Sequence, residues 1–165
     1  VRDSVYYFFK HEVNKKILLE ERGLNKHEKQ ETIDRFKSYS NEGAVLLGAS
    51  SGSFGEGIDL PGNLLKGVII VGLPLAKPDL ETQELINYYD ERFSRGWDYG
   101  YIIPAIIKSL QNAGRCIRSE TDKGCIIYLD ERYAWDNYKK CFPADANFEI
   151  TKMPVERIKD FFNKS

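Results

Sequence analysis

Continuous apolar stretches that alternate with helical patterns are the feature of this sequence that most restricts its fold. Three of these stretches are expected as buried strands, at residues 43–50, 66–74 and 124–130, and a shorter one lies at residues 17–19. Each is apolar at consecutive positions, which is typical of parallel strands that are covered on both faces. We therefore expect an α/β fold, a doubly wound layer whose ligands lie beyond the carboxyl ends of the strands.

Helical patterns fill most of the segments between these strands. The expected helices span residues 3–15, 26–40, 80–94, 98–119, 132–142 and 154–164. A length of 165 residues suits one domain with a full-sized core. We expect a single domain over residues 1–165, with a C-terminal helical extension at 143–165.

The overall charge does not indicate a general nucleic-acid-binding surface. The formal net charge is −1 and 30% of the residues are charged, so any nucleic-acid contact must be local. The apolar stretches are too short to span a bilayer, and we expect no membrane contact. Three cysteines without a metal-binding spacing are typical of reduced thiols, which favours a cytoplasmic or otherwise intracellular location.

The stretch QNAGRCIRS, residues 111–119, carries an amide and two guanidinium groups at helical spacing. At about 100° per residue, Gln111, Arg115 and Arg118 fall on one face of a helix. Gly114 beside them lets another surface approach closely. The alternative interpretation is a solvated basic edge.

Glycines and acidic residues gather in the loop GSFGEGIDLPG, residues 52–62. Glycines let backbone amides approach a phosphate or a nucleic-acid backbone. Asp59 could accept hydrogen bonds from a ribose hydroxyl or hold an arginine, and a flexible turn is the alternative. The sequence contains no G-x-x-x-x-G-K-[ST] motif, so we do not expect this domain to cradle phosphates as a P-loop does.

Aromatic and basic side chains are interspersed at residues 88–101, YYDERFSRGWDYGY. This mixture suits single-stranded nucleic acid, because a ring stacked on a base contributes about 1–3 kcal/mol. We expect Trp97 to be exposed in a loop between two helices, since its neighbours are polar or flexible. The alternative is that the rings pack the helix onto the sheet. Arg132 follows the carboxyl end of the last strand, where either a phosphate contact or a surface ion pair would fit.

Three residue pairs resemble metal-site fragments but are not expected to bind metal. The HE pair at residues 11–12 begins like H-E-x-x-H, but Lys15 occupies the fifth position. The DE pairs at residues 90–91 and 130–131 resemble acidic Mg²⁺ pairs. Neither follows a P-loop, so solvated or salt-bridged roles fit them better.

Together these motifs resemble the second motor domain of the XPD/DinG (Rad3-related) branch of superfamily 2 DNA helicases, and above all that of the archaeal XPD proteins. The resemblance runs from about residue 28 to residue 142. GSFGEGIDLPG looks like helicase motif V, and QNAGRCIRS looks like motif VI. VIIVGLP between them and IIYLDERY after them are similar to strands of the family.

The resemblance implies a three-layer RecA-like domain, with a mostly parallel sheet and helices on both faces. Such a domain faces a first motor domain, and ATP and Mg²⁺ are shared between the two. By motif position, Arg115 and Arg118 would be arginine fingers on the γ-phosphate. Gln111 would help to position the attacking water or the phosphate.

The resemblance also implies which residues serve DNA. Glu56, Gly57 and Asp59 would couple the nucleotide to the DNA track. Trp97 and Arg132 match positions of single-strand contacts in the archaeal XPD sequences. Translocation in the family runs from 5′ to 3′.

The sequence departs from the family pattern in three places. Many relatives carry Arg-Gly-Lys where this chain has SGS at residues 51–53, so the DNA contact expected at Ser53 is lost or moved. The strand that bears motif IV, expected before the first helix, is missing. The iron–sulfur cluster of the family uses four cysteines of the first motor domain, and Cys116, Cys125 and Cys141 do not match them.

The sequence thus predicts the C-terminal motor domain of an ATP-dependent 5′–3′ DNA helicase with a role in DNA repair. Its expected partners are single-stranded DNA, the first motor domain and repair proteins, and the isolated chain is expected to be inactive. The alternative is a non-catalytic protein-interaction module derived from a helicase. The intact Gln111, Arg115 and Arg118 argue against that alternative, because a scaffold has no need of paired fingers.

Overall fold

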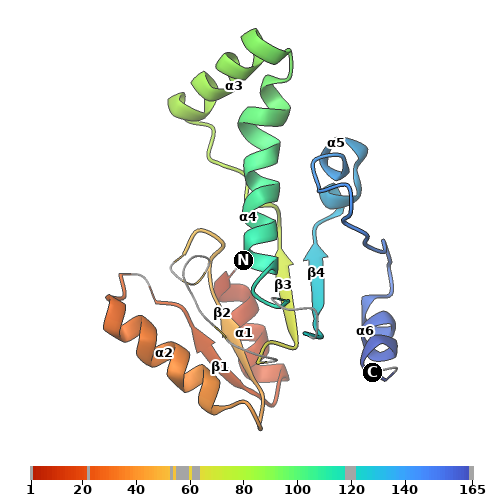
Figure 1. Cartoon of the computed structure of the whole chain (residues 1–165). Helices are drawn as coiled ribbons and strands as arrows, with labels where there is room; N and C mark the ends of the chain where they lie inside the picture. Colours follow the sequence, from red (N-terminus) through yellow and green to blue (C-terminus); the bar gives the residue numbers. More distant parts are fainter. Residues whose placement is uncertain are drawn as a thin grey trace. The chain divides into compact units, whose positions relative to one another are not determined.

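Strands and helices alternate along the chain in the computed structural model, which describes residues 2–21, 23–52, 54, 60, 64–117 and 122–163 (Figure 1). The elements are α1 (Arg2–Glu12), β1 (Lys16–Leu19), α2 (Lys26–Ser38), β2 (Ala44–Leu47), β3 (Gly67–Val71), α3 (Leu80–Phe93), η1 (Asp98–Ile102), α4 (Ile103–Ala113), β4 (Cys125–Leu129), η2 (Glu131–Ala134), α5 (Asp136–Lys139) and α6 (Pro154–Asn163). Each expected strand and helix has a counterpart in the structure with changed bounds, and the helix expected at residues 132–142 is divided into two pieces.

The chain divides into two compact units. The first comprises residues 1–70 and 108–126, and the second comprises residues 71–107 and 127–165. The expectation of a single domain stays a prediction. None of the helices in the described ranges is both long enough and apolar enough to cross a membrane.

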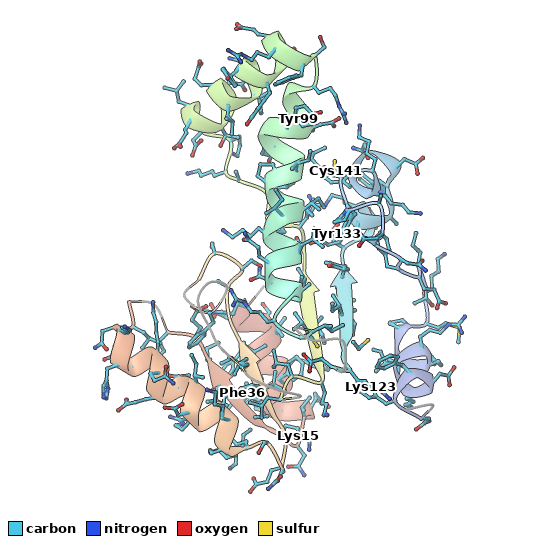
Figure 2. All side chains as sticks on the ribbon, in the orientation of Figure 1. Lys15, Phe36, Tyr99, Lys123, Tyr133 and Cys141 are labelled. Atoms are coloured by element: carbon cyan, nitrogen blue, oxygen red, sulfur yellow. The ribbon has the colours of Figure 1, made fainter. Side chains whose placement is uncertain are left out.

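In the first unit, β1 and β2 pair in parallel, from Lys16 opposite Ala44 to Leu19 opposite Leu47. Helix α1 packs against β1, and α2 packs against β2. The core beside α2 is formed by the buried side chains of Ile33, Phe54 and Leu60. Partly buried apolar side chains complete this core, namely Leu24, Phe36 (labelled in Figure 2), Leu46 and Leu65.

The strands β3 and β4 also run in the same direction (Figure 1). At one end the Cys125 amide donates to the Lys66 carbonyl at 3.0 Å, and at the other the Gly72 amide donates to the Leu129 carbonyl at 3.1 Å. Among the described residues the strands thus form two parallel pairs, β1–β2 and β3–β4. The predicted α/β class with parallel strands is confirmed.

The helix expected at residues 98–119 differs at its start. It begins with the π-helical segment η1, in which the Ile103 amide donates to the carbonyl of Asp98, five residues back. Pro104 explains this wider turn, because proline has no amide hydrogen and its ring collides with the carbonyl four residues before it.

The segment expected as one helix at residues 132–142 is broken into two short pieces. The 3₁₀ turn η2 precedes α5, and Trp135 between them is extended, with φ −72° and ψ 138°. One extended residue suffices to end the first helical turn and start the second in a new direction.

Candidate functional site

Gln111 and Arg115 lie on either side of the point where α4 ends. Gln111 is exposed on the last turn, and the helix ends at Ala113. Gly114 follows, and the next two amides, of residues 115 and 116, donate to carbonyls only three residues back. Arg115 therefore lies in a tight turn beyond the helix.

The helix expected to carry Gln111, Arg115 and Arg118 is shorter than predicted, and Arg115 lies in the turn that follows it, so the shared helical face stays a prediction. The α-helical hydrogen bonds continue to the Gly114 amide, which donates to the Leu110 carbonyl at 2.8 Å, and the spacing tightens to three residues at Arg115. Arg118 lies outside the described residues. Arg115 follows Gln111 by four residues, and both lie in one segment that runs from the last turn of α4 into the turn after it.

Buried residues hold the turn that carries Arg115. Ala113 is 2% exposed and Cys116 is 3% exposed. The Cys116 sulfur lies 3.6 Å from the carbonyl oxygen of Leu65, and a Cβ atom at Gly124 would overlap that sulfur. Burial raises the pKa of the Cys116 thiol, which favours its neutral form. Arg115 itself is half-buried and is not free of interactions.

The acidic glycine loop is described only at its flanks. The predicted site residues of this segment lie outside the described residues, namely Ser53, Glu56, Gly57 and Asp59. Phe54 and Leu60, which flank the central residues 55–59, are 8% and 4% exposed and pack with Ile33. The segment is therefore anchored in the core of the first unit at two points.

Trp97 projects from the first turn of a helix. Its backbone is helical, with φ −63° and ψ −42°, so the prediction that it lies in a loop is wrong. The connection lies earlier, at Ser94, whose φ of 53° is left-handed. The predicted exposure of Trp97 is confirmed, because 55% of the residue is accessible. Its ring lies against Tyr101, with centroids 4.7 Å apart and planes at 42°.

Other rings of this segment pack with one another. Tyr99 (labelled in Figure 2) lies 5.8 Å from Tyr89 and 5.7 Å from Phe93, between ring centroids. The Arg95 guanidinium lies 5.0 Å above the Tyr99 ring and also bonds Asp98 at 2.9 Å. These contacts join rings of α3 and η1, which differs from the expected packing of a helix onto the sheet, and Phe93 is as exposed as Trp97, at 55%.

Two glycines fix the position of Trp97. Gly96 precedes it, and the Gly96 amide donates to the Asp90 carboxylate of α3 at 3.1 Å. Gly100 follows in η1 and approaches the backbone of Ile86 in α3. The spacing of two glycines four residues apart, on one side of a helix, is the signal that could have found this close approach.

Arg132 lies in η2, directly after the carboxyl end of β4, as predicted. Its guanidinium forms a two-pronged ion pair with Asp130, at 2.6 Å from Nη2 to Oδ2 and 2.9 Å from Nε to Oδ1. The hydrogen bond from Arg132 holds the pKa of the Asp130 carboxyl below its ordinary value. The surface ion pair, one of the two interpretations of Arg132, is therefore present. A DNA phosphate would have to compete with Asp130 for the Arg132 guanidinium.

The pairs that resemble metal-site fragments have other contacts. Asp90 accepts the Gly96 amide, Asp130 binds Arg132, and the His11 ring lies 4.5 Å from the Tyr7 ring. In the part of the chain that the structure describes, no group of three or more His, Cys, Asp or Glu side chains is arranged to hold a metal.

Comparison with known proteins identifies relatives of most of this chain. It matches the family described as helicase C-terminal domain over residues 2–147. It is 33% identical over 150 residues to a probable ATP-dependent helicase of Methanocaldococcus jannaschii. This match covers 80% of this chain and 22% of that protein. It is 34% identical over 110 residues to the ATP-dependent DNA helicase DinG of Photobacterium profundum. This match covers 66% of this chain and 16% of that protein.

A solved XPD helicase has a similar fold, with a TM-score of 0.59 and 21% sequence identity. The match covers 85% of this chain and 29% of that structure, which confirms the expected RecA-like class of α/β fold. The chain spans about a fifth of the length of the curated relatives it matches. It belongs to the helicase C-terminal domain family, as the C-terminal domain of an XPD/DinG-type helicase.

Proposed function

We propose that this chain is the C-terminal motor domain of an ATP-dependent 5′–3′ DNA helicase with a role in DNA repair. The observation that carries the proposal is the position of Arg115, in a turn held by Ala113 and Cys116 and within the residues that match the family. A guanidinium that is held in place before the reaction can stabilise a transferring phosphoryl group without costly reorganisation.

ATP and Mg²⁺ are assigned mainly to the first motor domain, since this sequence has no P-loop. Arg115 and Arg118 would supply positive charge to the γ-phosphate, and Gln111 would orient the attacking water. Glu56 and its neighbours Gly57 and Asp59 would couple nucleotide to DNA. The iron–sulfur cluster expected for the family is likewise assigned to the first motor domain.

Single-stranded DNA is assigned to the ring pair of Trp97 and Tyr101. An exposed indole that is already held against a second ring offers a flat surface to a base at a small additional loss of side-chain entropy. Arg132 would add a phosphate contact by exchanging Asp130 for DNA.

A protein-interaction module is the second candidate, and apolar exposure on α3 favours it. Leu80, Leu85 and Tyr88 are 78%, 40% and 48% exposed, and exposed apolar surface of this kind can dock another protein. This candidate predicts binding to a protein without ATP-driven movement on DNA.

Unwinding assays with the full-length protein separate the two candidates. Partial duplexes with either a 5′ or a 3′ single-stranded tail are offered with ATP and Mg²⁺. We expect unwinding of the 5′-tailed substrate only, and we expect no ATP turnover above a buffer blank from the isolated 165-residue chain. Unwinding from the 3′ tail would contradict the proposed polarity, and the absence of ATP-dependent unwinding would favour the interaction module.

A further inference from the structure

Glu20 is a buried carboxylate to which the proposed function gives no role. It directly follows β1 and is 4% exposed. Its backbone continues the pairing with β2, because the Glu20 amide donates to the Leu47 carbonyl at 2.8 Å. The Glu20 carbonyl accepts a hydrogen bond from the Arg2 guanidinium at 3.0 Å. The backbone at Glu20 is therefore fixed, and the side chain points away from these two contacts to another part of the unit.

The carboxylate of Glu20 binds the chain that leaves β2 at two separate points. The Ala49 amide donates to Oε2 at 2.8 Å, and the Phe54 amide donates to Oε1 at 3.1 Å. A buried carboxylate is unfavourable unless its oxygens are hydrogen-bonded, and here each oxygen has a backbone donor. The side chain of Glu20 thus joins the end of β1 to the segment that leads from β2 into the loop of residues 52–62, called the glycine loop below.

Two glycines leave the space that this carboxylate fills. A Cβ atom at Gly48 would lie 3.0 Å from Oε2 of Glu20, and a Cβ atom at Gly52 would overlap the carboxylate. The side chain at position 20 and the glycines at positions 48 and 52 are therefore matched to each other. A substitution at Gly52 displaces the carboxylate without altering Glu20 itself.

We infer that Glu20 is a positioning residue that sets the start of the glycine loop and so transmits DNA binding to ATP hydrolysis. The inference rests on the proposed function, in which Glu56 and Asp59 act from that loop. Phe54 is anchored twice, by its amide on Glu20 and by its ring in the core with Ile33. A loop fixed at this point can pass on a displacement that a freely moving loop would absorb.

The test uses the full-length protein with three substitutions. Glu20→Gln keeps the shape but leaves one acceptor oxygen for two amides, and Gly52→Ala pushes the carboxylate aside. Leu18→Val is the matched control, because it removes buried apolar volume from the same strand and breaks no hydrogen bond to the loop. Hydrogen exchange at the amides of Ala49 and Phe54 reports the anchor, and the ratio of ATPase rates with and without single-stranded DNA reports the coupling.

We expect Glu20→Gln to speed exchange at one of the two amides, and Gly52→Ala to speed exchange at both, by about tenfold for each hydrogen bond lost. Both should lower the DNA-stimulation ratio by on the order of tenfold, because each variant loses at least one of these hydrogen bonds. The ATPase rate of Glu20→Gln without DNA should change little. Leu18→Val should lower the melting temperature and leave both readouts unchanged.

Each other outcome overturns a defined part of the inference. Unchanged exchange in both variants would show that Glu20 does not anchor the loop. Faster exchange with the same stimulation ratio as Leu18→Val would reduce Glu20 to a structural role. A wild-type protein without DNA-stimulated ATPase would refute the proposed function, and with it the coupling, while the exchange data would still decide the anchor.

Discussion

Gly100 of η1 lies directly against the backbone of Ile86 in α3. A Cβ atom at Gly100 would come within 2.8 Å of both the nitrogen and the Cα atom of Ile86. One turn earlier, a Cβ atom at Gly96 would lie 2.7 Å from the Cβ atom of Asp90. These glycines allow α3 and the start of the next helix to approach more closely than any side chain would permit. Trp97 lies between the two glycines in the sequence.

Gly100→Ala should therefore reduce the free energy of unfolding by about 1–3 kcal/mol, because backbone atoms of α3 cannot move aside as a flexible side chain can. Denaturant unfolding of the protein measures the change. Leu80→Ala on α3, at a residue that is 78% exposed, is the control and should cost less than about 0.5 kcal/mol. Wild-type stability of Gly100→Ala would show that the close approach does not stabilise the pair of helices.

The order of the elements could be predicted from the sequence because the strands are apolar at consecutive positions. The expected burial of both strand faces is wrong for β3 and β4, because Ile69, Val71 and Leu129 are 52%, 48% and 47% exposed. The ends of the long helix could not be predicted as well. A glycine such as Gly114 can permit a close approach or follow the end of a helix, and only the packed structure distinguishes the two roles. Pro104 marks a disturbed turn, but a proline in the sequence does not by itself specify the π-helical form that η1 takes.

The candidate site shows the same limit of prediction. The exposure of Trp97 follows from its polar neighbours, whereas its helical backbone does not, since Gly96 before it is usually a helix breaker. Arg132 could be placed at the end of β4 from the sequence. An ion pair is one of the two alternatives that the sequence offers for Arg132, but Asp130 could not be identified as the partner, because that depends on how the turn orients both side chains.

Trp97→Ala should weaken binding of single-stranded DNA by the full-length protein by about 1–3 kcal/mol, the usual contribution of one stacked base. Trp97→Phe should retain much of the affinity, because a ring remains against Tyr101. Fluorescence anisotropy with a labelled oligonucleotide measures the affinities. Tyr7→Ala, at a ring that is 68% exposed on α1, controls for general loss of aromatic surface. Equal losses at Tyr7 and Trp97 would argue against a specific stacking site.

Asp130→Asn should strengthen binding of single-stranded DNA, and Arg132→Ala should weaken it. Asparagine can still accept the Arg132 amide as a helix cap, so the turn η2 is kept while Arg132 loses its charged partner. Affinities measured from low to high salt should show a log–log slope that is smaller by about one for Arg132→Ala. If neither variant changes the affinity or the slope, the ion pair is structural and Arg132 does not bind phosphate.

The stability that Asp98 contributes should disappear in acid. Burial disfavours its charged form, but hydrogen bonds from Lys140 and Arg95, each at 2.9 Å, outweigh burial and hold the pKa of Asp98 below its ordinary value. A lowered carboxyl pKa stabilises the folded state above the unfolded pKa of about 3.9, and this stability is lost as the pH falls through the folded pKa. The melting temperature of Asp98→Asn should therefore lie below that of wild type at pH 7 and approach it near pH 3.

Thermal melts across this pH range also need a variant of a carboxylate whose ion pair is exposed to solvent. Asp3→Asn serves, because the Asp3 side chain is 83% exposed and its ion pair with Arg2 lies at the surface, where such pairs contribute little. Its difference from wild type should be small and similar at both pH values. A melting difference for Asp98→Asn that stays constant from pH 7 to pH 3 would show that the ion pairs of Asp98 add no net stability.

Arg115 decides whether the turn after α4 serves catalysis. An arginine finger meets charge that grows only in the transition state, so Arg115→Ala should leave nucleotide affinity nearly unchanged while kcat falls. In the full-length protein, DNA-stimulated ATPase should fall on the order of 10³-fold. Arg115→Lys should not restore it, since lysine presents a point charge and no planar fork.

Arg157→Ala is the matched control for the loss of a guanidinium. Arg157 lies in α6, outside the residues that match the family, and its exposed side chain pairs with Glu149 at 2.8 Å. Its removal should leave the ATPase rate unchanged. Because Arg115 is half-buried, its removal should lower the melting temperature by no more than about 3 °C. A far larger fall in melting temperature, or ATP hydrolysis at the wild-type rate, would mean that Arg115 holds the turn together and takes no part in the reaction.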